Sequence, residues 1–238
     1  MPGIAGLLAR ICQSVAASEG AQTLLTDTVR WILGQQRPNG SYPSWLVDGV
    51  DEPSGSNVAW CYGELGVAAV LLAAARALHD RAVEGRAIET ALICARRQTL
   101  TGTRDAGLCH GAAGNAHIFN RLFQATNDRE LRDAAVFWYQ SALNMRLGAQ
   151  VGVGGYRTWQ GTPGETLEFI WNEEDQTFLT GGTGIALTFL AATAPVKPEW
   201  DIVLLSDLEP ENPALPPGRQ KRELAEKVRC PRALDAVD

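Results

Sequence analysis

The segment Leu108-Cys109-His110-Gly111-Ala112-Ala113-Gly114, with the apolar-rich run that follows it, decides the fold of this chain. Its Gly-x-x-Gly string recurs at Gly3–Gly6, Gly63–Gly66 and Gly181–Gly184. Each string leads into an Ala/Leu-rich run, namely residues 7–15, 67–78, 116–123 and 185–192. The first glycines are 60, 48 and 70 residues apart, and each interval accommodates one helical hairpin plus loops. The repeat therefore predicts an array of helical hairpins.

Amphipathic segments separate these runs, at residues 21–34, 82–97 and 128–147. Their apolar and charged residues alternate with helical period, as in helices with one solvent-facing side. We therefore predict an all-α ring with small apolar helices inside and amphipathic helices outside. Glycines at the inner helix starts let backbones approach closely at one rim. A fifth string, Gly161–Gly164, contains Pro163 and leads into the alternating segment 166–171, for which we predict a loop or a short strand.

Composition bounds the class of protein. The chain has 238 residues, 45% of them hydrophobic and 20% charged, which is sufficient for a sizeable core. A net charge of −6 argues against a nucleic-acid partner. No apolar run reaches membrane-spanning length, so we predict no transmembrane segment. Residues 1–20 lack a basic start and Arg10 interrupts their apolar stretch, which favours a buried helix over a signal peptide and predicts a cytoplasmic location.

Two loops and a tail complete the chain. Residues 37–56 are rich in proline and glycine, and residues 150–180 are rich in glycine and tryptophan before turning acidic. Both loops precede inner helices, so we expect both at the same rim. The tail, residues 209–238, is Pro-rich and then charged, and we predict that it is a weakly packed extension.

Cys61, Cys109 and His110 are the candidate metal ligands, because two thiolates and an imidazole form a donor set suited to zinc. Five cysteines are an odd number for a disulfide framework. No good fourth ligand is apparent, since Cys12 and Cys94 fall within predicted helices and Cys230 falls in the tail. The fourth position is then open to a substrate or water. From spacing alone, an interpretation as ordinary packed residues stays open.

Other polar and aromatic residues have two interpretations each. His117 follows His110 on the same helix face and lines a pocket or is packed, with packing favoured. His79 and Asp80 fall at a helix end, where we expect them to be solvated. The acidic segment 173–175 contacts a basic leader peptide or is a solvated loop, the latter being favoured. Four tryptophans shape a peptide groove or pack in the core or at the rim: Trp45, Trp60, Trp159 and Trp171.

The strings Ala59-Trp60-Cys61-Tyr62-Gly63 and Leu108–Gly114 resemble the two signature motifs of the lanthionine synthetase C-like cyclases of lanthipeptide biosynthesis. Residues 178–187 resemble the start of the last inner helix of that family, and Glu199-Trp200-Asp201 resembles its closing segment. The resemblance spans about residues 3–208 and implies an α/α toroid of seven inner and seven outer helices. The chain has about four of those hairpins, so we expect residues 1–208 to form a partial cyclase domain.

The resemblance also implies a chemistry. Cys61, Cys109 and His110 correspond to the zinc ligands, and the substrate is a precursor peptide with dehydrated serines and threonines. A cysteine thiolate of this peptide adds to dehydroalanine or dehydrobutyrine and forms a thioether (lanthionine) ring. Tyr62 matches a tyrosine of the family and is the candidate catalytic residue, or else a wall of the pocket. The implied partners are the peptide, a dehydratase and a missing N-terminal half.

Two positions depart from the family pattern. Pro2 stands where the family has an acid histidine, and Asn57 stands where it has an arginine. Proline has no acid function, so two hypotheses remain open. The chain is a zinc-dependent cyclase, truncated or impaired, or it is a non-catalytic zinc-binding scaffold that recognises a peptide or a partner enzyme.

Overall fold

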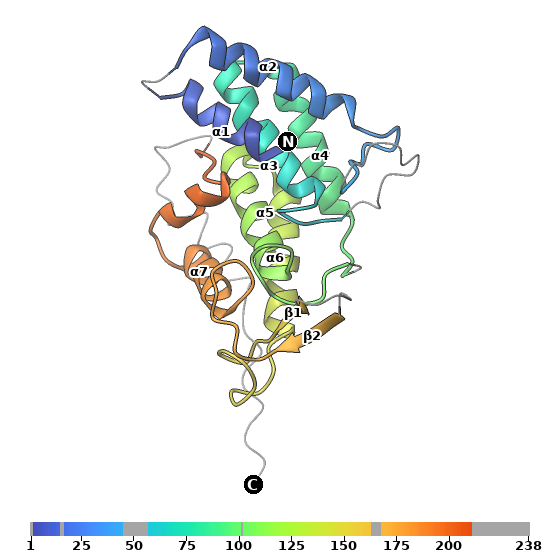
Figure 1. Cartoon of the computed structure of the whole chain (residues 1–238), viewed down its shortest axis with the longest axis vertical. Coiled ribbons are helices and arrows are strands. Elements are labelled where there is room, and N and C mark those ends of the chain that lie inside the picture. The colour runs from blue at the N-terminus through green and yellow to red at the C-terminus, as the bar shows by residue number, and fades with distance from the viewer. Residues whose placement is uncertain (1, 15–16, 45–56, 101, 163–167, 211–238) are drawn as a thin grey trace.

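The computed structural model describes residues 2–14, 17–44, 57–100, 102–162 and 168–210. Within these ranges the chain is mostly α-helical, with one two-stranded sheet and one 3-10 helix (Figure 1). The elements are α1 (Pro2–Cys12), α2 (Glu19–Gly34), α3 (Glu64–Leu78), α4 (Arg81–Arg96), α5 (Ala112–Thr126), α6 (Arg129–Asn144), β1 (Thr158–Thr162), β2 (Glu168–Asn172), α7 (Gly182–Thr193) and η1 (Glu199–Leu204).

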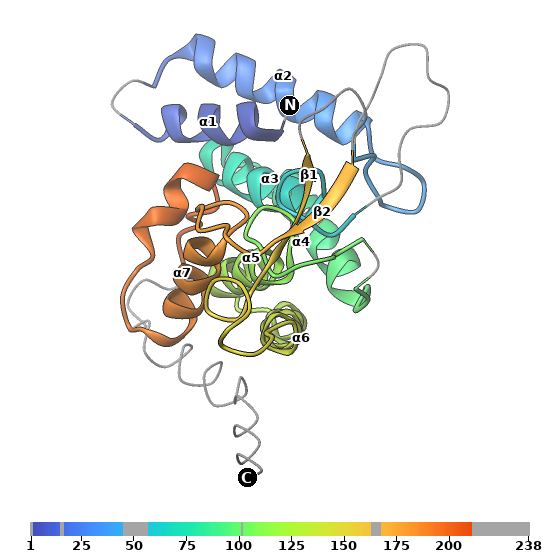
Figure 2. The ribbon, with the colours of Figure 1, turned by 60° about the horizontal axis from the view of Figure 1, so that its bottom comes forward.

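The odd-numbered helices form an inner row. Helix α1 packs against α3, α3 against α5, and α5 against α7. Helices α2, α4 and α6 pack on the outside of this row, and both Figure 1 and Figure 2 show α2 lying along the outer side of α1. The predicted all-α class is confirmed, and the arrangement is that of a fragment of an α/α toroid.

Burial distinguishes the inner helices α3 and α5 from the outer helices as predicted, whereas the inner helices α1 and α7 each bury only one stripe. Every residue of α5 from Ala112 to Ala125 is buried, whereas α4 buries only one stripe that includes Ala87 and Ala91. Helix α1 is offset from the predicted run, because it begins at Pro2, whose fixed φ suits a first helical residue. It ends at Cys12, so this cysteine lies at the end of a helix rather than within one.

Two-residue turns connect α3 to α4 and α5 to α6. His79 follows α3 in the left-handed conformation (φ 54°), and the Asp80 carboxylate then accepts hydrogen bonds from the first N–H groups of α4. Asn127 (φ 55°) and Asp128 repeat this turn between α5 and α6. The prediction that His79 and Asp80 lie exposed at a helix end is confirmed.

A hairpin interrupts the helices between α6 and α7. Strands β1 and β2 are antiparallel, with Trp159 opposite Trp171. The predicted loop or short strand corresponds to β2, whereas its partner β1 lies in the segment 150–180 that the sequence predicts as a loop. Thr158 is the buried, inward-facing residue of β1, and its burial is not apparent from the sequence pattern. Pro163 and Gly164 lie outside the described residues.

Among the described residues, no helix is both long and apolar enough to cross a bilayer. The predicted tail lies almost entirely outside the described residues, as does the segment 45–56 with Trp45. The boundary at residue 208 therefore stays a prediction.

Candidate metal centre

The starts of α3, α5 and α7 share one backbone pattern. In each, the N–H of the first helical residue donates to the carbonyl seven residues earlier. These bonds join Glu64 to Asn57, Ala112 to Asp105 and Gly182 to Asp175, at 3.1, 3.0 and 3.0 Å. Each loop therefore folds back onto the start of its own helix, and the three loops have the same shape.

The second glycine of each string is what permits this fold. A Cβ atom placed there would lie within about 2 Å of a backbone carbonyl oxygen, closer than any real contact. The pairs are Gly66 with Trp60 at 2.0 Å, Gly114 with Leu108 at 1.8 Å, and Gly184 with Phe178 at 2.0 Å. The prediction that these glycines allow close backbone approach is confirmed.

Cys61 and Cys109 occupy the same position in two successive repeats, two residues before the first glycine. The N–H of Cys61 donates to the carbonyl of Cys109 at 3.4 Å, which brings the two loops side by side. His110 follows in the second loop. The two Sγ atoms and an imidazole nitrogen all lie within 4.8 Å of one another, and each residue is half-buried. The described part of the chain holds no other such group of potential metal ligands.

The three donors fit a zinc ion. Zn–S and Zn–N bonds are about 2.3 and 2.0 Å long, so ligand atoms of one zinc ion lie no more than about 4.6 Å apart. The three donor atoms lie within 4.8 Å of one another, so small movements of these side chains would bring them to zinc-binding distances. Three protein ligands also leave one coordination position open, as in catalytic rather than structural zinc sites.

The electrostatics of the group favour a cation. A hydrogen bond from the Cys109 thiol, with further help from His110, lowers the pKa of Cys61 to about 5 against the effect of burial. The same bond raises the pKa of Cys109, because one proton is held between the two sulfurs. A hydrogen bond to Cys61 raises the pKa of His110. A metal that displaces the shared proton would meet two thiolates.

Two buried carboxylates position the Cys109 loop, and the sequence analysis missed both. Asp105 is 3% exposed, and its Oδ1 accepts from the Gly107 N–H at 2.9 Å. Its Oδ2 accepts from the Trp159 N–H at 2.8 Å, which ties β1 to the loop. The charge of Asp105 also contributes to the raised pKa of His110, after the larger effect of Cys61.

Asp175, the second buried carboxylate, holds the segment that contacts the other side of the Cys109 loop. Its carboxylate accepts hydrogen bonds from Thr158 and Thr180 at 3.1 and 2.7 Å. Burial would raise the pKa of Asp175, but hydrogen bonds from Thr180, Thr177 and Thr158 together lower it. The adjacent Leu179 carbonyl accepts from the Cys109 N–H at 2.8 Å. The expectation of a fully solvated acidic loop is therefore wrong at Asp175, whereas Glu173 and Glu174 are exposed.

A repeat offset would have identified these aspartates. Asp105 and Asp175 each lie six residues before the first glycine of their string, and Asn57 lies at the same offset before Gly63. All three positions carry an Asx side chain. Asn57 itself is exposed, and its backbone carbonyl makes the contact to Glu64.

Tyr62 and Pro2 lie together with Cys61 around a cavity of about 380 Å³. Tyr62 is 65% exposed. Pro2 begins α1 directly before Gly3, the repeat position that His110 holds before Gly111. An imino acid without a titratable side chain thus stands beside the candidate metal centre.

His117 is packed, as favoured, and does not join the candidate ligands. It is fully buried in α5, with Nε2 3.0 Å from the Asp201 carboxylate and its ring 4.6 Å from that of Trp200. Arg121 lies 3.0 Å from the same carboxylate. These contacts fix the closing segment η1 to α5.

Of the four tryptophans singled out in the sequence, the three in described segments make defined contacts with the rest of the fold. Trp60 donates its Nε1–H to the Leu204 carbonyl at 2.9 Å. Trp159 and Trp171 contact each other across the hairpin, and the guanidinium of Arg104 lies over Trp159 while that of Arg157 lies over Trp171.

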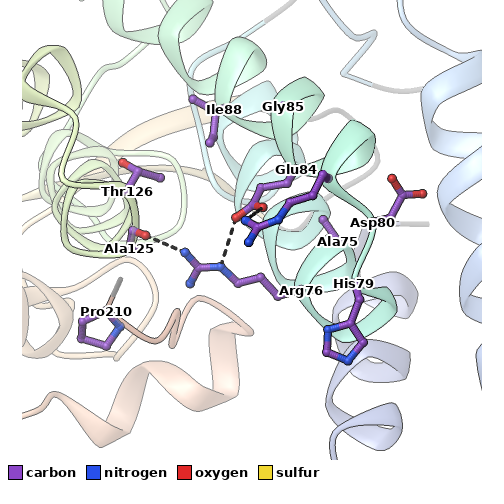
Figure 3. A pocket seen from close by; sticks show the side chains of 11 residues that line it. Ala75, Arg76, His79, Asp80, Glu84, Gly85, Ile88, Ala125, Thr126 and Pro210 are labelled. Atoms are coloured by element: carbon purple, nitrogen blue, oxygen red, sulfur yellow. Dashed lines mark hydrogen bonds and ion pairs between the residues drawn. The ribbon is translucent and has the colours of Figure 1, made fainter. Parts of the chain in front are cut away.

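The opposite end of α3 carries a larger cavity, of about 840 Å³, whose charged groups are engaged with one another (Figure 3). Arg76 donates to the carbonyls of Ala125 and Glu209 and pairs with Glu84. Glu84 also pairs with Arg81. Arg76 thereby holds the chain that follows η1. The cavity lies at the end of α3 that is far from Cys61, and α3 is 15 residues long.

The inner row of helices and the thiol–imidazole group at one rim together define a helical toroid fragment with a Cys/Cys/His group that could hold a metal ion. The chain belongs to the lanthionine synthetase C-like protein family, whose model matches residues 1–205. The membership expected from the cysteine motifs is confirmed.

Two known proteins are similar to this chain, one in sequence and one in fold. It is 30% identical over 138 residues to "Glutathione S-transferase LANCL1" of Danio rerio, a match that covers 57% of this chain and 33% of that protein. Its fold is similar to that of nisin cyclase, with a TM-score of 0.64 and 19% identity, over 86% of this chain and 48% of nisin cyclase. The chain thus spans about half of nisin cyclase, and at this identity the likeness shows the fold.

Proposed function

We propose that the chain binds one zinc ion through Cys61, Cys109 and His110 and forms thioether bonds in peptides. The observation that carries this proposal is the convergence of two Sγ atoms and an imidazole nitrogen within 4.8 Å. Family membership supports it, because the motifs of these three residues are those by which the sequence resembles the cyclases.

Bound zinc would lower the pKa of a substrate thiol and hold it as a nucleophile. The proposed substrate is a precursor peptide that contains dehydroalanine or dehydrobutyrine. In the reaction the cysteine sulfur bonds to the β-carbon, the carbon–carbon π bond breaks, and the α-carbon receives a proton. The thiol proton passes to solvent, so the net change is addition of S–H across the double bond.

The proton for the α-carbon requires a donor near Cys61. We propose the Tyr62 hydroxyl, because Tyr62 lines the same cavity as Cys61 and is exposed to an entering peptide. Pro2, on the same cavity, offers no proton. Ring formation is therefore expected to depend on Tyr62 in this chain.

The wider setting follows from the substrate. A dehydratase must supply the dehydrated residues, and the remainder of a ring would lie beside the helices described here. We place this activity in the cytoplasm. A glutathione thiol is a second possible nucleophile, since the relative from Danio rerio is named a glutathione S-transferase.

The competing hypothesis is a zinc-binding scaffold without catalysis, which Pro2 and Asn57 favour. The decisive experiment incubates the zinc-loaded chain with a dehydrated peptide that carries one cysteine. Ring formation leaves the mass unchanged, so the readout is loss of the thiol that iodoacetamide can alkylate. We expect loss with the unaltered chain and with Cys12→Ala, but not with Cys109→Ala. Stoichiometric zinc without any loss of thiol, with the dehydratase also present, would favour the scaffold.

A further inference from the structure

The cavity beside Cys61 has walls from four parts of the chain. It has a volume of about 380 Å³, at the lower end of the range for ligand pockets. The start of α1, the end of α2, the segment 42–44 and the Cys61 loop enclose it. Among the described residues its lining is Pro2, Trp31, Ile32, Gln35, Tyr42, Pro43, Ser44, Trp60, Cys61, Tyr62, Gly63 and Val67.

This lining is largely aromatic and, among the described residues, holds no cationic side chain. Four aromatic side chains contribute to it, those of Trp31, Tyr42, Trp60 and Tyr62, and no described lining residue is Asp, Glu, Lys, Arg or His. An anionic ligand group would lose its hydration there and meet no cationic side chain among the described lining residues. An aromatic or aliphatic group would instead bury apolar surface against rings that prefer such contacts.

Buried contacts hold the walls in place. Tyr42 is 3% exposed, and its N–H donates to the Glu64 carboxylate at 2.9 Å. Glu64 is itself buried and pairs with Arg97, so the segment 42–44 is fixed to the start of α3. The Trp60 ring is fixed by its bond to the Leu204 carbonyl. The pocket is therefore preformed.

Trp31 and Tyr62 are 43% and 65% exposed, so both reach solvent from the pocket wall, and Cys61 belongs to the same wall. We infer that this pocket binds an apolar, preferably aromatic, side chain of the molecule whose reacting atom approaches Cys61. Under the proposed function, on which this inference rests, the pocket selects peptides that carry such a residue next to the reacting cysteine. Peptides with an acidic residue at that place are disfavoured.

Alkylation of Cys61 in the metal-free chain tests the pocket without zinc or ring formation. The two reagents are iodoacetamide and N-benzyl-iodoacetamide, and the readout is the rate of modification at each cysteine by peptide mass spectrometry. The benzyl reagent is expected to react about ten-fold faster at Cys61, relative to its rate with free cysteine, because burial of one ring is worth about a factor of ten. The same reagent should show no such preference at Cys12.

Two variants on the same helix locate the effect. Trp31→Ala should abolish the benzyl preference at Cys61, whereas Leu24→Ala, a side chain 57% exposed on α2 and not part of the lining, should keep it. Equal relative rates for the two reagents in the unaltered chain would overturn the inference. So would a preference that survives Trp31→Ala in a variant with an unchanged helical circular dichroism spectrum. Failure of zinc binding or ring formation would leave this result unaffected.

Discussion

At the scale of single residues, the three converging donors predict the metal content of the purified chain. Cys61→Ala, Cys109→Ala and His110→Ala each leave two ligands, which hold zinc far more weakly than three. We expect about one zinc per unaltered chain and little in the three variants after dialysis, measured by elemental analysis. Cys12→Ala, outside the group, should retain the metal. Full zinc in Cys109→Ala would contradict the proposed ligands.

The thiols also differ in their reactivity when no metal is bound. The lowered pKa of Cys61, about 5, means that it stays a thiolate as the pH falls from 8 to 6, whereas an ordinary thiol becomes protonated. Burial raises the pKa of Cys94 to about 12, so Cys94 should react last. Iodoacetamide modification followed by mass spectrometry should show a Cys61 rate nearly constant over this range. A decline parallel to that of free cysteine would refute the assignment.

The residues that carry chemistry were accessible from the sequence, and those that position them were not. Cys61, Cys109 and His110 belong to rare residue types in recurring strings, which made them candidates, and the family resemblance favoured them as ligands over ordinary packed residues. Asp105 and Asp175 act through hydrogen bonds to backbone N–H and threonine groups, and aspartate in a loop is common. Only their shared offset from the glycines distinguishes them.

At the scale of elements, two glycines in helices give opposite predictions. Gly114 lies against the Leu108 carbonyl, so Gly114→Ala should destabilise the fold by roughly 2–4 kcal/mol and displace the Cys109 loop. Gly85 lies within α4 with nothing near its missing side chain, so Gly85→Ala should stabilise by about 0.5–1 kcal/mol. Urea unfolding measures both changes, and zinc affinity should fall only in Gly114→Ala. Similar effects from the two substitutions would invalidate the role given to the loop contact.

The helices were predictable because the inner ones carry two signals, a glycine string and an apolar run, and the outer ones carry an amphipathic period. A glycine string marks the start of an inner helix, and the apolar period distinguishes inner from outer helices. The hairpin was harder to predict, since β1 has only five residues and its burial depends on Asp105 and Asp175 from other segments. Tertiary contacts, rather than local pattern, define that strand.

At the scale of the molecule, Asp201 connects the last segment to the inner row. It is fully buried and lies 3.0 Å from both His117 and Arg121. Asp201→Ala leaves the buried guanidinium without this carboxylate, which should cost about 3–5 kcal/mol and lower Tm by about 10 °C. Glu199→Ala, two residues earlier and exposed, should change stability by less than about 0.5 kcal/mol. Thermal unfolding followed by circular dichroism compares them, and a small loss for Asp201→Ala would mean that η1 adds little to the fold.

Three elements on one side of the molecule carry exposed apolar side chains, and these side chains are here called the flank. Helix α1, helix α7 and η1 lie on one side in both Figure 1 and Figure 2. Their exposed side chains include Leu7 at 54%, Leu190 at 57%, Ile202 at 42% and Val203 at 67%. An exposed apolar surface over three neighbouring elements favours association. The flank belongs to the first and last inner helices of the row, where a toroid would continue.

We therefore expect this chain, studied by itself, to associate reversibly as its concentration rises. Leu7→Glu combined with Val203→Glu places two charges on the flank and should shift the chain toward monomer at every concentration. Leu147→Glu, 40% exposed on the loop after α6, is the matched control and should leave association unchanged. Sedimentation velocity over a concentration series measures the shift. A chain that stays monomeric throughout, or association that survives the paired charges, would show that the flank is not a contact surface.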